Sequence, residues 1–73
     1  RLKAMDHNGL LRRTLQAWFR HNVQPLATSK ALFIHRNTLE YRLNRISELT
    51  GLDLGSFDDR LLLYIALQLD EQR

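Results

Sequence analysis

The sequence predicts an all-α fold: a small domain of four helices. Apolar residues recur at steps of three or four along four segments, the spacing that lines one face of a helix. Pro25, Gly51 and the pair Asp58 and Asp59 stand between these segments, at positions where helices begin or end. With 73 residues and no cysteine, the chain is one domain at most and has no disulfide framework, so it needs an efficient helical core.

The charge of the chain is unevenly distributed. Residues 1–45 carry nine Lys and Arg side chains against two acidic ones, a net charge of +7, whereas residues 46–73 carry two against six, a net charge of −4. A positive side of this kind suits a polyanion; chance clustering in a small chain is the alternative. No segment has the roughly 18 uninterrupted apolar residues of a membrane span, so we expect no membrane partner and a cytoplasmic location.

The first amphipathic helix is predicted at about residues 9–21. Asn8 is its expected N-cap, and Trp18 and Phe19 are expected to anchor the core, because aromatic residues at helical spacing usually do. The start of the chain lacks both an initiating methionine and the apolar stretch of a signal peptide. We therefore expect a fragment of a longer protein, with residues 1–8 as a linker and residues 9–73 as the domain.

The second helix is predicted to begin near Pro25 and to run to Phe33, because proline can start a helix but cannot continue one. The small residues Ser29 and Ala31 would let another helix cross closely, and the angle between the two helices would be filled by Leu32 and Ile34. The implied geometry is a helix, a three-residue turn and a second helix.

The third helix is predicted from Asn37 to Thr50, ended by a left-handed cap at Gly51. Its apolar stripe consists of Leu39, Leu43, Ile46 and Thr50. At about 100° per residue the opposite side holds Asn37, Tyr41, Asn44, Arg45 and Glu48, with Thr38 on its rim. An apolar back and a polar front that starts at the N-terminus are what a recognition helix needs. An ordinary surface helix is the alternative.

The last helix is predicted at about residues 59–71, with Asp58 and Asp59 favoured at its N-terminus by capping and by the helix dipole. It is apolar on nearly every side, with Leu61, Leu62, Leu63, Tyr64, Ile65, Ala66, Leu67 and Leu69. One small core cannot cover every face, so part of this helix would pack on a second copy or on another domain. A fully wrapped central helix is the alternative.

The string from Leu32 to Leu39, followed by Tyr41-Arg42-Leu43 and later by Thr50-Gly51-Leu52, resembles the C-terminal DNA-binding domain of the PucR/CdaR family of bacterial transcriptional regulators. The resemblance covers about residues 10–70, and the turn and its helix also resemble the Fis-type helix-turn-helix domain. It implies double-stranded DNA as a partner. In the branch most similar to this sequence, it implies activation of sugar-diacid (glucarate, galactarate or glycerate) utilisation genes, with a small-molecule effector bound by regions outside this chain.

One residue departs from the general helix-turn-helix pattern. Many such proteins have glycine where Phe33 stands, and glycine adopts positive φ at no steric cost. The family that this sequence resembles tolerates a bulky residue at this position, so we expect Phe33 to fill the core at the turn.

Enzymatic chemistry finds no support in the sequence. The three histidines have no ligand at metal-binding spacing, no serine lies in a nucleophile elbow, and there is no glycine-rich phosphate loop. Glu40 and Glu48 are eight residues apart on a helix, too far for a paired acid and base. We expect no catalytic residue, no metal and no cofactor.

The roles in DNA binding follow from residue type. Four residues in or directly before the third helix are expected to contact bases. Arg36 would read guanine or clamp a phosphate, and Asn37 would read adenine or cap the helix. Thr38 would contact a thymine methyl group or a phosphate, and Tyr41 would contact a base or donate to a phosphate. For backbone contact we expect Arg42, Arg45, Lys30, Arg12 and Arg13, with His35 as a cap first and a phosphate contact second. We expect a homodimer on DNA. A helical interaction or dimerisation module that uses the last helix is the alternative function, and RNA binding ranks below it.

Overall fold

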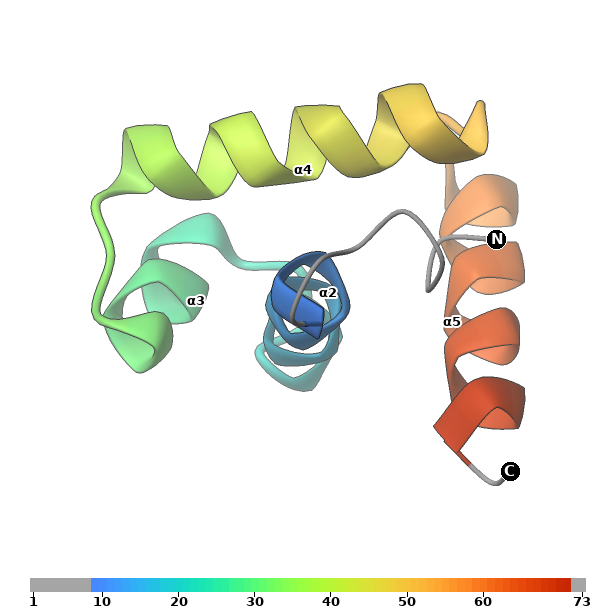
Figure 1. Ribbon diagram of the computed structural model, residues 1–73, viewed down its shortest axis with the longest axis horizontal. Coiled ribbons are helices and arrows are strands. Elements are labelled where there is room, and N and C mark those ends of the chain that lie inside the picture. The colour runs from blue at the N-terminus through green and yellow to red at the C-terminus, as the bar shows by residue number, and fades with distance from the viewer. Residues whose placement is uncertain (1–8, 72–73) are drawn as a thin grey trace.

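The computed structural model describes residues 9–71. They form four helices, α2 (Leu10–Arg20), α3 (Pro25–Leu32), α4 (Arg36–Thr50) and α5 (Phe57–Glu71), which confirms the predicted all-α fold. In Figure 1, α4 lies along the longest axis of the molecule, with α3 below one of its ends, α5 below the other and α2 between them. The predicted linker, residues 1–8, and the expected cap Asn8 lie outside the described residues.

The core forms around α2, which contacts α3, α4 and α5. Its buried members come from three helices: Leu11, Leu15, Trp18, Ile46, Leu63 and Leu67. Phe19 packs against this cluster, and its ring meets that of Tyr64 edge to face at a centroid distance of 5.3 Å. The predicted role of the two aromatic residues of α2 as core anchors is confirmed.

The helix boundaries follow the residues that punctuate the sequence. Pro25 is the first residue of α3, and Gly51 ends α4 in the left-handed conformation, with its N–H donating to the Ser47 carbonyl at 2.8 Å. The last helix begins at Phe57, two residues earlier than predicted, so Asp59 lies inside its first turn. There an Asp59 carboxylate oxygen accepts the N–H of Asp53 at 2.7 Å, which ties the preceding linker to the helix.

Only one side of α5 enters the core. Leu63 and Leu67 are buried, each 5 % exposed, whereas the large apolar residues Leu61, Leu62, Ile65 and Leu69 are 45–61 % exposed. The alternative of a fully wrapped last helix is therefore wrong for this chain. The expectation that part of the helix stays uncovered is confirmed.

Candidate nucleic-acid interface

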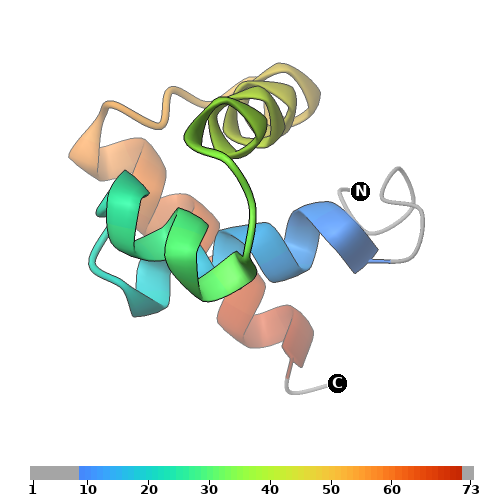
Figure 2. The ribbon, with the colours of Figure 1, turned by 90° about the vertical axis from the view of Figure 1, so that its left-hand side faces the viewer.

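The helix-turn-helix consists of α3, a turn of residues 33–35, and α4, and Figure 2 shows the two helices on either side of this turn. Thr28 and Ser29 are the residues that α3 buries, at 0 % and 3 % exposure. Their hydroxyl groups donate to carbonyls of the preceding turn, those of Gln24 and Leu26, so burial leaves no donor unpaired. Ser29 and Ala31 were predicted to lie where another helix crosses α3 closely. The prediction is right for Ser29 and wrong for Ala31, which is exposed.

Phe33 does not fill the core, so that prediction is wrong. Its backbone is left-handed, with φ 58° and ψ 43°, and its side chain is 94 % exposed. The N–H of Ile34 donates to the Ser29 carbonyl at 3.0 Å and that of Phe33 to the Lys30 carbonyl at 3.2 Å. This pair of hydrogen bonds closes a helix end only when the residue after the helix is left-handed, so the turn imposes the conformation despite the phenylalanine.

The N-terminus of α4 is capped by His35. The Nδ1 atom of its side chain accepts the N–H of Asn37 at 3.0 Å, and the helix begins at Arg36, one residue earlier than predicted. Because Nδ1 accepts in the cap, Nε2 carries the ring proton and is left as a hydrogen-bond donor. The expectation that His35 caps the helix is confirmed, and Asn37 lies inside the helix.

The two sides of α4 differ as the spacing of the sequence predicts. Leu39 and Ile46 are 0 % exposed, which fixes the rotation of the helix against the rest of the domain. On the outward side, Tyr41 is 67 % exposed. The other exposed residues of this side are Asn37, Thr38, Asn44, Arg45 and Glu48. α4 therefore presents a row of hydrogen-bonding side chains that starts at its N-terminus.

Two arginines of α4 pair with acidic residues of the same helix. Arg36 lies 3.9 Å from Glu40, and Arg45 lies 3.2 Å from Glu48, with all four side chains at least half exposed. Exposed pairs of this kind contribute about 0–1 kcal/mol. Either guanidinium can therefore exchange its carboxylate for a phosphate or a base edge at small cost.

The remaining basic residues that were expected to contact DNA lie in different surroundings. Lys30 is exposed in the last turn of α3, and Arg13 is exposed on α2. Arg12 pairs with Asp70 of α5 at 3.2 Å. The half-buried Arg42 donates to the Thr14 hydroxyl of α2 at 3.5 Å. The structure therefore places Arg12 and Arg42 at contacts between helices, away from the outward row of α4.

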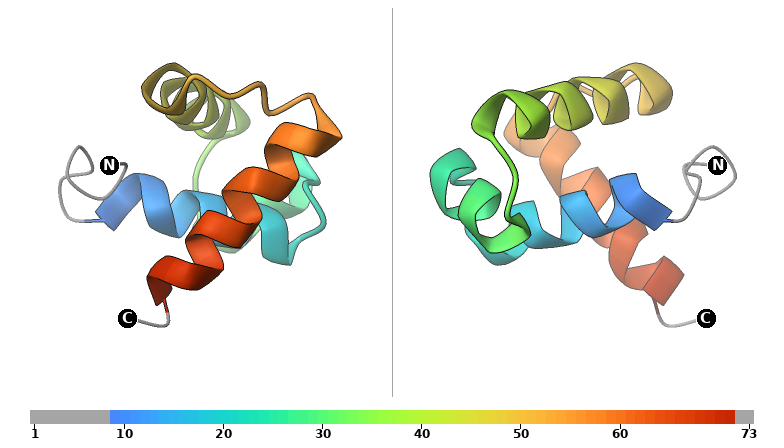
Figure 3. Two further views of the ribbon diagram at one scale, coloured as in Figure 1. Left: turned by 90° about the vertical axis from the view of Figure 1, so that its right-hand side faces the viewer. Right: turned by 60° about the vertical axis from the view of Figure 1, so that its left-hand side comes forward.

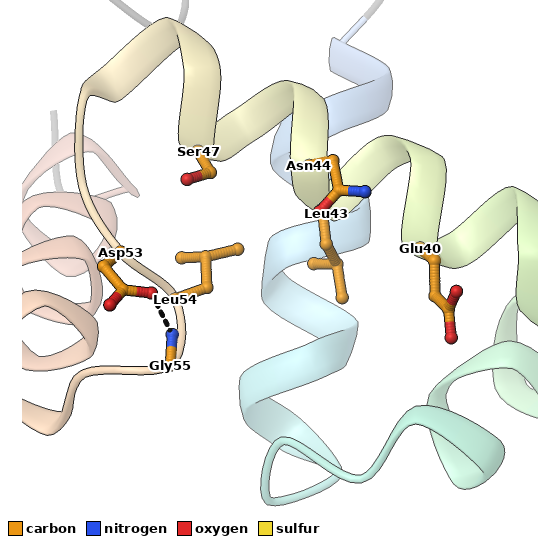
Figure 4. A pocket seen from close by; sticks show the side chains of 7 residues that line it. All are labelled: Glu40, Leu43, Asn44, Ser47, Asp53, Leu54 and Gly55. Carbon is orange, nitrogen blue, oxygen red and sulfur yellow. Dashed lines mark hydrogen bonds between the residues drawn. The ribbon is translucent and has the colours of Figure 1, made fainter.

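A shallow hollow of about 290 Å³ lies between α4 and the linker that precedes α5 (Figure 4). It is lined by Glu40, Leu43, Asn44, Ser47, Asp53, Leu54 and Gly55. Its charged groups are the carboxylates of Glu40 and Asp53, and the latter already accepts the N–H of Gly55 at 2.8 Å. A hollow with this lining repels phosphate and does not suit a DNA backbone.

Within residues 9–71, no three acidic, histidine or cysteine side chains gather where they could hold a metal ion. The helices found in this part of the chain are too short or too polar to cross a bilayer.

The comparisons with known proteins agree with this geometry. The family of PucR C-terminal helix-turn-helix domains matches residues 11–69. The carbohydrate diacid regulator of Escherichia coli K12 is 92 % identical over the whole chain, which covers 19 % of that protein. The proline-responsive transcriptional activator PutR of Bacillus subtilis is 38 % identical over 99 % of the chain, and the transcriptional activator PmfR of Paenarthrobacter nicotinovorans is 44 % identical over 81 %.

The chain spans about a fifth of the length of the curated relatives that it matches over nearly its whole extent, with shares of 18–19 %. No solved structure matches it. The family match runs from Leu11 of α2 to Leu69 of α5, so it reaches all four helices and includes the entire helix-turn-helix. The chain is a member of the family of PucR C-terminal helix-turn-helix domains, the DNA-binding domains of transcriptional regulators.

Proposed function

We propose that this domain binds specific double-stranded DNA sequences by placing the N-terminal half of α4 in the major groove. The observation that carries the proposal is the contrast between the two sides of α4: Leu39 is 0 % exposed and Tyr41 is 67 % exposed. A helix held by its back can hold the hydrogen-bonding groups on its front at fixed positions against base edges.

The domain serves a bacterial regulator that activates the utilisation of sugar diacids. This assignment is supported by the 92 % identity to a carbohydrate diacid regulator, of which the chain covers 19 %. The small-molecule effector binds parts of the regulator outside this chain, and the regulator acts in the cytoplasm. DNA binding by this domain is then the output that the effector controls.

The residues of α4 divide by role. Arg36, Asn37, Thr38 and Tyr41 contact bases, with Arg36 reading guanine through its O6 and N7 atoms. Arg45 contacts the phosphate backbone, because it lies a further turn along the exposed side. The proton on Nε2 of His35 supplies another phosphate donor while Nδ1 keeps the cap. Lys30 and Arg13 add charge from α3 and α2.

Arg42 and Arg12 take part more weakly. Each already contacts another helix, Thr14 in one case and Asp70 in the other, so binding a phosphate would cost that contact. We assign to both a long-range electrostatic contribution, which raises affinity for any duplex alike.

Two copies bind together. A single module of this size covers about 600–1,000 Å² of protein surface on DNA, which seldom suffices for specific recognition. The regulator is therefore a homo-oligomer on its operator, with half-sites about 34–36 Å apart.

The test compares Arg36→Ala with Arg45→Ala. Duplexes selected from a random pool by this domain provide the specific site, and a scrambled duplex provides the control. Arg36→Ala should lower affinity for the selected site by about 1–3 kcal/mol and relax the preference at one base pair. Arg45→Ala should weaken both duplexes alike and reduce the salt slope by about one. Identical behaviour of the two variants would contradict the division of roles.

The exposed apolar side of α5 favours a second candidate function, a helical module for protein interaction or dimerisation. Gel shifts with random duplex at low and moderate salt separate the two functions. DNA binding through the basic side must weaken as salt rises, whereas an absent or salt-insensitive shift favours the interaction module.

A further inference from the structure

Phe33 combines a strained backbone with an exposed aromatic ring. Its φ of 58° and ψ of 43° lie in the left-handed region, where a residue other than glycine is strained. Its side chain is 94 % exposed, the largest exposed fraction among the large apolar residues of the described chain. The ring therefore adds almost nothing to the core. Backbone strain that brings no packing in return is found preferentially at binding and active sites.

Phe33 lies at the end of α4 that carries the base-contacting residues. It is the first residue of the turn of residues 33–35, and α4 begins three residues later at Arg36. In Figure 1 this turn is at the opposite end of α4 from α5, and it faces the viewer in Figure 2 and in the right-hand view of Figure 3. A duplex that meets the first turn of α4 therefore passes close to Phe33.

The sequence around Phe33 carries no negative charge. Residues 9–39 contain four arginines and one lysine, and no acidic residue. The two cations that are nearest to Phe33 along the chain, Lys30 and Arg36, are both exposed. Positive charge on either side of the ring attracts the phosphates that flank a groove and would hold the duplex against the ring.

The chemistry of the ring limits what it can contact on DNA. A phenylalanine ring has no hydrogen-bonding group, so its contacts are with apolar parts of the duplex. In the major groove the C5-methyl group of thymine is the apolar group that distinguishes base pairs, and phenylalanine is among the side chains that contact it. The backbone sugars are the same at every base pair. Contact with a methyl group therefore gives specificity, whereas contact with a sugar gives none.

We propose that Phe33 is a specificity-determining residue that packs its ring against the C5-methyl group of a thymine near the base pair read by Arg36. This inference rests on the proposed function, because it requires the N-terminal half of α4 to lie in the major groove. Three residues of chain span at most about 11 Å, and successive base pairs are about 3.4 Å apart. The thymine therefore lies within about three base pairs of the one that Arg36 reads.

The hydrogen bonds of the turn hold the backbone of Phe33 in place. Its N–H donates to the Lys30 carbonyl at 3.2 Å, and that of Ile34 donates to the Ser29 carbonyl at 3.0 Å. A side chain that projects from a fixed backbone loses little conformational freedom when it binds. The contact with thymine thus gives the strained phenylalanine a role that glycine could not fill.

A protein partner is the alternative occupant, and the surroundings of Phe33 favour DNA. Ala31 is small, and Leu32 and Ile34 are half-buried, so Phe33 is not part of a broad apolar patch. One phenylalanine ring offers about 150–250 Å² of contact area, whereas a standard protein interface buries about 800 Å² per partner. A single methyl group in a groove needs no larger surface than this ring.

Deoxyuridine in place of thymine removes only the methyl group and so provides a direct test. Duplexes selected from a random pool by the 73-residue chain define the specific site. Thymines within three base pairs of the one that Arg36→Ala relaxes are then replaced singly. One replacement should weaken binding of the parent chain about fourfold, the factor that burial of one methyl group gives. Phe33→Ala should bind the thymine and deoxyuridine duplexes with equal affinity.

Three control variants separate this contact from stability and from other contacts with thymine. Phe33→Gly, which removes the strain, should also lose the fourfold difference, so that unfolding is excluded as the cause. Leu26→Ala removes an apolar side chain, 55 % exposed, in the first turn of α3, and it should keep the difference. Thr38→Ser removes a methyl group of α4 and should lower overall affinity, but it should keep the difference between the two duplexes.

The outcomes distinguish this proposal from the proposed function. If the parent chain selects specific duplexes but no thymine in this range shows the methyl effect, or if the effect survives Phe33→Ala, the Phe33 contact is overturned and recognition by α4 stands. A loss in Phe33→Ala that is equal for every duplex assigns the ring to a sugar and also overturns the proposal. Unchanged affinity of Phe33→Ala for every duplex does the same and leaves the ring to a protein partner. If the parent chain prefers no duplex, the proposed function fails, and the Phe33 contact fails with it.

Discussion

Replacing Phe33 by glycine should stabilise the domain. Phe33 has φ 58° and ψ 43°, and a non-glycine residue in this conformation costs about 1–2 kcal/mol. Its side chain is 94 % exposed, so removing it loses less than about 0.3 kcal/mol of burial. Glycine also increases the conformational freedom of the unfolded chain, which lowers the free energy of unfolding by about 0.4–1 kcal/mol. The net expectation is a gain of about 0.5–1 kcal/mol.

Thermal unfolding followed by circular dichroism measures this gain. For a domain of this size, about 0.5–1 kcal/mol corresponds to a rise in Tm of roughly 3–6 °C. The matched control is Ala31→Gly, at an exposed position two residues earlier but inside α3, where glycine should instead destabilise by about 1 kcal/mol. Phe33→Ala is a second control, because alanine removes the ring and keeps the backbone cost, so it should leave Tm nearly unchanged.

A fall in Tm for Phe33→Gly as large as that for Ala31→Gly would refute the reasoning. It would mean that the ring contributes packing or that the residue is not left-handed. DNA affinity measured on the same variants adds a further result. If the exposed ring touches the duplex, Phe33→Gly and Phe33→Ala will both weaken binding to the selected site, although only one of them changes stability.

Three further changes test other contacts. His35→Ala should destabilise by about 1 kcal/mol through loss of the N-cap, and His35→Asn should restore most of it, as measured by urea unfolding. Leu39→Ala should cost about 2–5 kcal/mol because its side chain is fully buried, whereas Leu26→Ala, at 55 % exposure, should stay within about 0.5 kcal/mol. Arg42→Ala should lower stability by roughly 0.5–1.5 kcal/mol through its bond to a threonine of α2, and Arg45→Ala should change it by less than about 0.5 kcal/mol. Equal losses of stability for Arg42→Ala and Arg45→Ala would contradict the assignment of a stabilising contact between Arg42 and α2.

The parts of the fold that the sequence predicts well are those set by periodicity and by single punctuating residues. Leu39 and Ile46 recur at helical spacing, and both are fully buried. Pro25 and Gly51 mark the start of α3 and the end of α4. These signals are local, so they can be read without knowledge of what the helices pack against.

The side chains whose position depends on other helices were predicted less well. The sequence marks Arg12 and Arg42 as basic residues suited to phosphate, and only the packing of α2 against α5 and α4 brings Asp70 and Thr14 to them. The burial of Thr28 likewise depends on how the helices pack together. Its hydroxyl bonds the Gln24 carbonyl, and a polar residue satisfied in this way can occupy a core position that a pattern of apolar residues does not reveal.

The two turns around α3 explain why Phe33 was misplaced. α2 and α3 end with the same pair of hydrogen bonds, since the N–H of Val23 donates to the Trp18 carbonyl at 2.8 Å as that of Ile34 does to Ser29. The left-handed residue that this closure requires is Asn22 in the first turn, where asparagine is a recognisable signal, and Phe33 in the second, where nothing in the residue type indicates it. The hydrogen bonds of the turn thus fix the backbone, and the residue at position 33 bears the strain. Because a glycine would remove that strain with almost no loss of packing, the stability of the fold does not account for the exposed phenylalanine at the entrance to α4.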